Sequence, residues 1–353
     1  MNYKKLGNSE LKISTIALGT MTWGEQNSQE EAFEQMDYAF EKGINIFDSA
    51  ELYPVSPSKE TQGETSRILG LWVKSRKVRD KIIIADKVVG RSGMKWFRDG
   101  GIETRLDRSQ IEFALDRTLK NLQIDCVDLY QLHWPDRPIN VFGGLEYEHS
   151  ETDDVIKIEK TLSILDQLVK KGKIRHIGLS NETAWGASQF IKIASEKNMT
   201  KIVSIQNPYN LLNRSFEVGL SEISIREQVG LLAYSPLASG ILSGKYFDGK
   251  MPKGSRMDLF GHRYPRYKTL NAEAAAKKYH EVAKKHGLNP CQMAIKFCEI
   301  QPFVTSVIIG ATKMEQLKTN IDSVNINLDE NIIKKIGEIH KKYPNPCPYK
   351  KLH

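Results

Sequence analysis

The chain has 353 residues, of which 40% are hydrophobic and 27% charged, with a formal net charge of +8 at pH 7. This length allows one large α/β barrel, and no apolar run reaches the ~18 residues of a membrane span. Residues 1–6 lack the pattern of a signal peptide, so we expect a soluble, cytoplasmic protein with no membrane partner.

The positive charge is distributed along the chain. Lysine pairs recur in predicted helices at 170–171, 277–278 and 284–285, which favours a solvated basic surface and predicts no nucleic-acid partner. The same charge would attract a phosphate-bearing cofactor from a distance. The cysteines have no metal-ligand or Cys-x-x-Cys spacing, so we expect reduced, mostly buried thiols and no metal site. They are Cys126, Cys291, Cys298 and Cys347.

The predicted elements begin with a hairpin, because runs at 3–6 and 11–13 flank the turn residues Gly7-Asn8-Ser9. Eight short apolar runs then alternate with segments of helical period, which is typical of repeated βαβ units. The predicted strands are Ile16–Leu18, Ile44–Asp48, Ile82–Lys87, Val127–His133, Ile174–Ser180, Ile202–Gln206, Leu231–Tyr234 and Val304–Ile309. The predicted fold is therefore a (β/α)8 TIM barrel, one domain over residues 1–353, with the hairpin closing the barrel's amino-terminal end.

Helix starts are predicted where capping-box pairs occur. These pairs are Ser28 with Glu31, Thr61 with Glu64, and Ser109 with Glu112. Apolar stripes of helical spacing within 111–122 and 158–169 should pack on the barrel's outer wall. After the last strand we expect one helix from about Lys313 and another over 329–341.

Three connections, 88–107, 135–153 and 246–269, are too long for tight turns. All follow strand ends, so we expect them over the carboxyl-terminal face, where barrel active sites lie. The two later ones hold aromatic residues that could form walls or a lid for an apolar or aromatic substrate, or could be ordinary loop packing. These are Phe142, Tyr147, Phe260, Tyr264 and Tyr267.

Four polar residues, Asp48, Tyr53, Lys87 and His133, stand at or just after consecutive predicted strands. A parallel barrel would bring them to one rim. Reduction of a carbonyl needs a proton donor at the oxygen, and a phenol with its ordinary pKa of about 10 is a poor donor at neutral pH. We expect Lys87 to lower the pKa of Tyr53, and Asp48 to hold Lys87 in place. His133 is expected to orient the carbonyl oxygen by a hydrogen bond.

At these residues the sequence resembles the aldo-keto reductases over nearly the whole chain. The matching motifs are residues 43–53 (GINIFDSAELY), 172–181 (GKIRHIGLSN), 206–210 (QNPYN) and 233–237 (AYSPL). Within that family it is similar to the bacterial Tas-type members at 24–27, 53–55, 60–63, 213–220 and 316–321. The resemblance implies a TIM barrel that binds NADPH in an extended pose without a Rossmann domain, and no Gly-x-Gly-x-x-Gly follows the first strand.

The resemblance also implies cofactor contacts. Ser180, Asn181 and Gln206 match positions that bind the nicotinamide carboxamide, and Tyr234 matches the ring stacked beneath it. The segment that follows, together with Lys245, suits a pyrophosphate. The full expected set is Thr20, Met21, Ser180, Asn181, Gln206, Tyr234, Ser235, Pro236, Leu237, Ser239, Gly240, Lys245, Gly310, Thr312, Lys313, Gln316 and Asn320, with Trp23 and Trp134 as substrate contacts.

One position departs from the common family pattern. Gln316 stands where an arginine often binds the adenosine 2′-phosphate, although Lys313 and Thr312 remain as possible contacts. The expected cofactor is therefore NADPH/NADP, with NADH possible.

The expected activity is NADPH-dependent reduction of an aldehyde or ketone, with Tyr53 as proton donor. One alternative is a nucleotide-binding, redox-sensing regulatory subunit similar to the potassium-channel β subunits on the same fold. Another is an isomerase or aldolase with Lys87 as a Schiff-base amine, which pairing with Asp48 would oppose because a nucleophilic lysine must be uncharged. The sequence does not fix the natural substrate or the oligomeric state.

Overall fold

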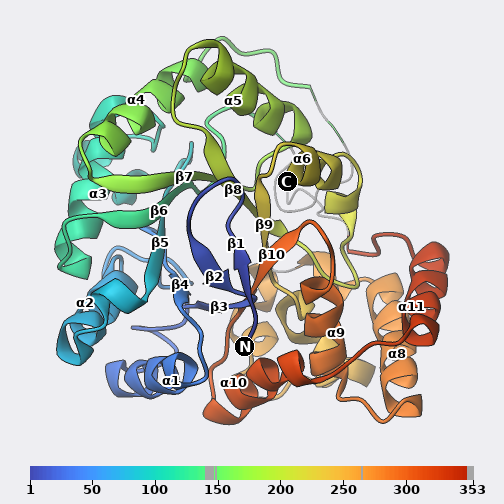
Figure 1. The fold of residues 1–353 in the computed structure, drawn as a ribbon. Helices are drawn as coiled ribbons and strands as arrows, with labels where there is room; N and C mark the ends of the chain where they lie inside the picture. Colours follow the sequence, from blue (N-terminus) through green and yellow to red (C-terminus); the bar gives the residue numbers. More distant parts are fainter. Residues whose placement is uncertain (140–146, 148, 264, 348–353) are drawn as a thin grey trace.

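The fold is seen in a computed structural model that describes residues 1–139, 147, 149–263 and 265–347. Eight parallel strands close into a barrel in the order β10-β3-β4-β5-β6-β7-β8-β9 (Figure 1). They are β3 (Ile16–Gly19), β4 (Ile46–Asp48), β5 (Ile83–Val88), β6 (Val127–Leu132), β7 (Ile174–Ser180), β8 (Ile202–Pro208), β9 (Gly230–Tyr234) and β10 (Val304–Ile309). All eight predicted strands are confirmed, and so is the predicted TIM barrel.

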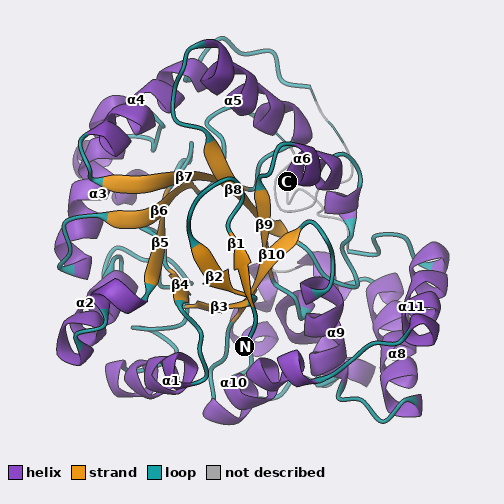
Figure 2. Cartoon of the chain, in the orientation of Figure 1, coloured by secondary structure: helices purple, strands orange, loops and turns teal. Residues whose placement is uncertain are grey.

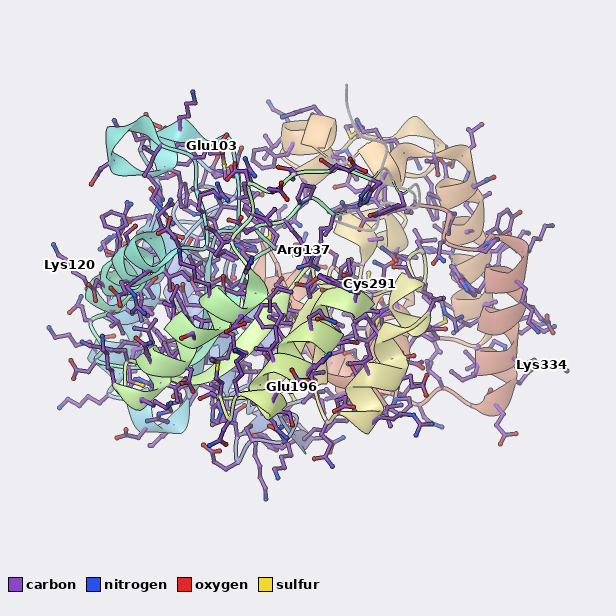
Figure 3. All side chains as sticks on the ribbon, turned by 90° about the horizontal axis from the view of Figure 1, so that it is seen from above. Glu103, Lys120, Arg137, Glu196, Cys291 and Lys334 are labelled. Atoms are coloured by element: carbon purple, nitrogen blue, oxygen red, sulfur yellow. The ribbon has the colours of Figure 1, made fainter. Side chains whose placement is uncertain are left out.

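Helices form a ring around the strands, as Figure 2 shows. They are α1 (Gln29–Glu41), α2 (Glu64–Arg76), α3 (Arg108–Leu122), α4 (Ile158–Lys170), α5 (Ala184–Glu196), α6 (Leu220–Arg226), α7 (Arg256–Phe260), α8 (Leu270–Lys285), α9 (Pro290–Glu299), α10 (Met314–Ile321) and α11 (Glu330–Lys342). The predicted apolar stripes of α3 and α4 face the barrel and join the main core. Charged side chains such as Lys120, Glu196 and Lys334 project outward from the helices (Figure 3). No helix within the described ranges is long and apolar enough to cross a membrane.

One of the three predicted helix starts is confirmed. Ser28 Oγ accepts from the Glu31 backbone N–H at 3.2 Å, and the Glu31 carboxylate accepts from the Ser28 N–H at 2.9 Å. The other two helices are present, but their predicted capping boxes are wrong. Helix α2 follows Gly63, whose φ of 86° ends the preceding turn, so the hydroxyl of Thr61 caps nothing. Helix α3 begins earlier, because the Asp107 carboxylate accepts from the Gln110 N–H at 3.0 Å and takes the capping position.

The predicted hairpin is present as β1 (Tyr3–Lys5) and β2 (Lys12–Ser14), which pair antiparallel. Leu6, just after β1, and Ile13, within β2, are fully buried in an apolar cluster with inward-facing barrel residues such as Ala17 and Leu129. At Gly7, with φ +54°, an added Cβ would lie 2.2 Å from the Val203 carbonyl oxygen. The hairpin therefore closes the amino-terminal end of the barrel against water.

The long connections contain short helical turns that were not predicted, at 95–97 and 99–101 in the first and at 247–249, 256–260, 261–263 and 265–268 in the third. Among the aromatic residues, Tyr267 is buried packing, whereas Tyr147 is 71% exposed. Phe142 and Tyr264 lie outside the described residues. Of these aromatic residues, Tyr267 is thus assigned to ordinary loop packing, and the lid prediction stays untested for the others.

All four cysteines are free thiols. Cys298 and Cys347 are buried, while Cys126 and Cys291 are partly exposed. Among the residues that the structure describes, no cluster of His, Cys, Asp or Glu could hold a metal ion.

Candidate active site

The four predicted groups meet at the carboxyl-terminal end of the barrel. Lys87 Nζ donates to Asp48 Oδ2 at 2.7 Å and to the Ser49 carbonyl oxygen at 2.7 Å. The same ammonium lies 5.0 Å from the centroid of the Tyr53 ring. The ring centroids of Tyr53 and His133 are 5.9 Å apart, nearly edge to face. Because inward positions alternate along a strand, Asp48, Lys87 and His133 all face the barrel axis.

Lys87 carries its charge inside the protein. Its side chain is fully buried, and burial alone would lower its pKa. The negative charge of Asp48, joined by that of Tyr53 once the phenol ionises, outweighs that cost and raises the pKa of Lys87 above its ordinary value. Lys87 is therefore protonated at neutral pH. This opposes a Schiff-base role, which requires a neutral amine.

The predicted effect of Lys87 on Tyr53 is present, but it does not decide the net shift. Burial raises the pKa of Tyr53, and the charge and hydrogen bond of Lys87 lower it without overcoming burial. The net pKa therefore lies above its ordinary value, because the phenolate is poorly solvated in this site. Tyr53 consequently holds its proton at neutral pH, and Lys87 is placed to stabilise the phenolate that remains after the proton leaves.

His133 is a neutral imidazole. Burial first, and then the charge of Lys87, lower its pKa well below the ordinary value. Its backbone carbonyl accepts from Asn181 Nδ2 at 2.8 Å, and its Nδ1 has no hydrogen-bond partner among the described residues. A neutral imidazole carries one N–H, which is sufficient to donate to a carbonyl oxygen.

The residues expected around the nicotinamide form one hydrogen-bonded network. Tyr234 Oη donates to Asn181 Oδ1 at 2.6 Å, and Ser180 Oγ donates to the Gln206 carbonyl oxygen at 2.8 Å. Gln206 Nε2 donates to Asp48 Oδ1 at 2.8 Å, which joins this network to the acid–base cluster. The Thr20 hydroxyl donates to the backbone carbonyl oxygen of Asp48 at 2.9 Å, which connects Thr20 to the same cluster.

The loop after β9, residues 235–240, forms a tightly turned cradle. Ser235, Ala238, Ser239 and Gly240 all have positive φ, between 48° and 96°. The Ala238 and Gly240 N–H groups donate to the Ser235 and Leu237 carbonyl oxygens at 2.9 and 2.8 Å, so a side-chain hydroxyl and a cation would be the main donors to an anion here. Ser239 Oγ is buried without a partner among the described residues. A Cβ added at Gly240 would lie 3.5 Å from Lys245 Nζ, so this ammonium stands beside the loop. Pro236 and Leu237 complete the turn, and the donor set fits a pyrophosphate.

The segment after β10 leads into α10, where the expected adenosine contacts lie. Gln316 Oε1 accepts from the Thr312 N–H at 3.2 Å, and Asn320 Nδ2 donates to the Gly310 carbonyl oxygen at 3.3 Å. Gln316 thus folds back on its own chain and supplies no charge. Lys313 is exposed at the N-cap of α10, three residues before Gln316, and is the cation that could contact a 2′-phosphate there.

The two predicted substrate contacts differ. Trp134 is half-buried beside His133, and its indole N–H donates to the Arg91 carbonyl oxygen at 2.9 Å. Trp23 is fully buried and donates to Gln35 Oε1 at 3.0 Å, so it has no surface left for a substrate. Met21, expected among the cofactor contacts, is partly exposed two residues after β3.

Sequence reasoning missed four buried residues near the site. Gln131 contacts Asp48 from β6, and Glu51 pairs with Arg98 behind the rim. Asp86, next to Lys87 but on the outer side of β5, is fully buried, and burial raises its pKa to about 7. A polar residue inside an apolar strand was the available signal for Gln131 and Asp86.

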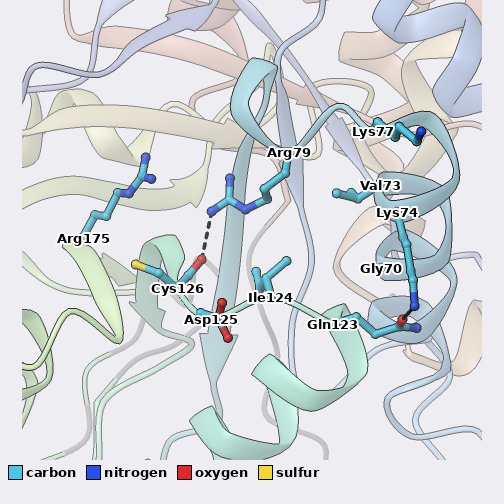
Figure 4. A pocket seen from close by; sticks show the side chains of 10 residues that line it. All are labelled: Gly70, Val73, Lys74, Lys77, Arg79, Gln123, Ile124, Asp125, Cys126 and Arg175. Carbon is cyan, nitrogen blue, oxygen red and sulfur yellow. Dashed lines mark hydrogen bonds between the residues drawn. The ribbon is translucent and has the colours of Figure 1, made fainter.

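A hollow of about 440 Å³ lies at the opposite end of the barrel, where β5 and β6 begin (Figure 4). Its arginines are already engaged, because Arg79 donates to the Cys126 carbonyl oxygen at 2.8 Å, and both Arg79 and Arg175 pair with buried Asp128. This hollow is separate from the four candidate groups.

Comparison with known proteins agrees with this geometry. The family model described as "Aldo/keto reductase family" matches residues 15–341. The protein named "Protein tas" from Escherichia coli is 47% identical over 350 residues, covering 99% of this chain and 100% of that protein. "Uncharacterized oxidoreductase YrpG" from Bacillus subtilis is 30% identical, covering 98% and 97%. "Putative voltage-gated potassium channel subunit beta" from Schizosaccharomyces pombe is 31% identical, covering 99% and 96%.

Proposed function

The chain is an oxidoreductase of the aldo/keto reductase family, and from that premise we propose that it reduces an aldehyde or ketone to the alcohol with NADPH. The observation that carries this proposal is the buried ion pair of Lys87 with Asp48 beside a protonated Tyr53. A phenol next to a fixed ammonium can give up its proton to an oxygen that is gaining negative charge.

When bound, NADPH would supply the hydride that the carbonyl carbon accepts. Tyr53 Oη gives its proton to the carbonyl oxygen, so the carbonyl gains the two electrons and two hydrogens of an alcohol. Lys87 stabilises the phenolate, and Asp48 keeps Lys87 charged and in place. His133, neutral and close to Tyr53, donates to the same oxygen and orients it.

The proposed cofactor is NADPH, with Ser180, Asn181, Gln206 and Tyr234 around the nicotinamide. The cradle at 235–240 and Lys245 would hold the pyrophosphate, which is supported by the unpartnered Ser239 hydroxyl. Lys313 supports a 2′-phosphate contact, while Gln316 leaves binding of NADH open.

The test combines binding with turnover. NADPH and NADH are titrated separately against intrinsic protein fluorescence, and NADPH consumption is then followed with a panel of aromatic and short-chain aldehydes. We expect tighter binding of NADPH and carbonyl-dependent oxidation of it. Absence of nucleotide binding, or binding without consumption across the panel, would contradict the proposed reductase.

A second candidate is a nucleotide-binding regulatory subunit, favoured by the 31% identity to a protein named as a potassium channel β subunit. Tight NADPH binding with very slow turnover, together with a partner protein that co-purifies, would support this function over the first.

A further inference from the structure

A buried amide lies directly below the candidate acid–base groups. Gln131 of β6 is fully buried and stands in register with Lys87 of β5. Its Nε2 donates to Asp48 Oδ1 at 3.3 Å, and its Oε1 accepts from Gln206 Nε2 at 3.3 Å. Two amides, Gln131 and Gln206, therefore hold Oδ1 of Asp48, while Lys87 holds Oδ2.

The neighbouring strand leaves room for this side chain. Gly178 of β7 is in register with Gln131, and a Cβ added there would lie 2.9 Å from Gln131 Cγ and 2.6 Å from Ser204 Oγ. Its φ is not positive, so the backbone does not require glycine. The small residue instead allows Gln131 to extend across the barrel interior to Asp48.

An amide at this depth needs an explanation. The interior just below is apolar, with Leu129, Ala85 and Leu232 in one cluster, and a buried amide costs free energy unless its polar atoms are bonded. The hydrogen bonds of the Gln131 side chain go to Asp48 and Gln206. An apolar side chain would fill the same space without that cost.

We propose that Gln131 is a positioning residue for the proton transfer from Tyr53. By fixing Oδ1 of Asp48 it sets the rotation of the carboxylate, so that Oδ2 faces Lys87 and the ammonium stays directed at the phenol. Among the described residues, the Gln131 side chain forms hydrogen bonds with Asp48 and Gln206 and none with Tyr53 or His133, so it would act through Asp48. This inference rests on the proposed reductase function.

The test uses Gln131→Met, which has a similar volume but no N–H donor. We expect kcat to fall about tenfold, as for loss of one hydrogen bond to a charged group, with the Kd for NADPH within twofold of wild type. With one donor removed, the negative charge of Asp48 is less compensated. The alkaline limb of the kcat–pH profile should therefore move to higher pH, since that charge opposes ionisation of Tyr53.

Two further variants keep the test decisive. Gly178→Ala crowds Gln131 and should move the alkaline limb in the same direction, which serves if Gln131→Met fails to fold. Ser306→Ala is the matched control. Ser306, in β10, is as fully buried as Gln131, but its hydroxyl has no hydrogen-bond partner among the described residues. It should change neither kcat nor the pH profile.

The outcomes separate the two proposals. A wild-type protein without carbonyl-dependent NADPH consumption overturns the reductase function and this inference together. An active wild type with an unchanged kcat–pH profile in Gln131→Met and Gly178→Ala overturns the positioning role alone. A lower kcat at every pH with an unmoved alkaline limb also overturns it, since that is the result of a general packing defect.

Discussion

The two sides of the site are built differently. The acid–base side, formed by the ends of β4 to β8, satisfies its charges within the chain, since both oxygens of Asp48 and the ammonium of Lys87 have partners. The proposed phosphate side, formed by residues 235–245 and 310–320, instead has a buried hydroxyl at Ser239 without a partner among the described residues, and successive residues at positive φ. We infer that the acid–base side is organised before any ligand binds, whereas the phosphate side is completed by its ligand.

This difference predicts which measured quantity each side controls. Changes on the acid–base side should lower turnover and leave nucleotide affinity near wild type. Changes on the phosphate side should weaken nucleotide binding and leave turnover at saturation intact.

Lys87→Met should have the largest effect, because it leaves Asp48 buried without its cation. Breaking a buried ion pair by removing one partner costs about 3 kcal/mol or more of stability. We also expect kcat to fall at least about a hundredfold. Urea unfolding measures the loss of stability, and steady-state kinetics measures the loss of kcat. The control is Lys335→Met, which breaks an exposed pair with Glu338 and should cost almost nothing.

Tyr53→Phe should lower kcat at least about a hundredfold, a typical contribution of a general acid. The ring that contacts Lys87 and His133 is retained, so stability and the Kd for NADPH should stay near wild type. Steady-state kinetics gives kcat, and fluorescence titration gives the Kd for NADPH. Undiminished rates would remove Tyr53 from the mechanism.

Asp86 is the exception on the acid–base side, since no cation among the described residues pairs with its buried carboxylate. The carboxylate accepts hydrogen bonds from the Thr118 and Ser66 hydroxyls and from the Lys87 N–H. Its folded pKa of about 7 exceeds the unfolded value of 3.8. Between these values the unfolded chain releases the proton that the folded chain keeps, so stability falls as pH rises from about 4 to 7.

Asp86→Asn removes this dependence. The variant should gain stability relative to wild type between pH 5 and pH 8, by on the order of 2 kcal/mol. Urea unfolding of both proteins at the two pH values measures the gain. An equal difference between the proteins at both pH values would show that Asp86 is ionised throughout.

Lys245→Ala tests the phosphate side. Loss of the ammonium beside Gly240 should raise the Kd for NADPH about tenfold, as for one charge-assisted contact. The kcat at saturating NADPH should not change. Lys250→Ala, an exposed lysine in the same segment, is the control and should leave the Kd unchanged. A lower kcat at saturation in Lys245→Ala would show that the two sides are not independent.

Gln316→Arg should have the smallest effect. It replaces a side chain that now bonds Thr312 with one that can meet a 2′-phosphate. We expect the ratio of NADPH to NADH affinity to rise severalfold, with the Kd for NADH unchanged. An equal change for both nucleotides would place residue 316 away from the 2′-phosphate.

Much of this architecture could be predicted from the sequence, because buried parallel strands are apolar on consecutive residues and their ends meet at one rim. The positions of Asp48, Lys87 and His133 at strand ends followed from the same rule. The direction of the Tyr53 pKa could not be predicted, since it depends on how deeply the phenol is buried. Gln131 was missed because its contact with Asp48 crosses the barrel and depends on strand register. The start of α3 was misplaced because two capping residues, Asp107 and Ser109, compete there.

The most direct test of the division between the two sides is the single-turnover rate of NADPH oxidation at saturating nucleotide, measured in parallel for Tyr53→Phe and Lys245→Ala. The account predicts a loss of at least about a hundredfold in Tyr53→Phe and the wild-type rate in Lys245→Ala. Comparable losses in both variants, or a wild-type rate in Tyr53→Phe, would contradict it.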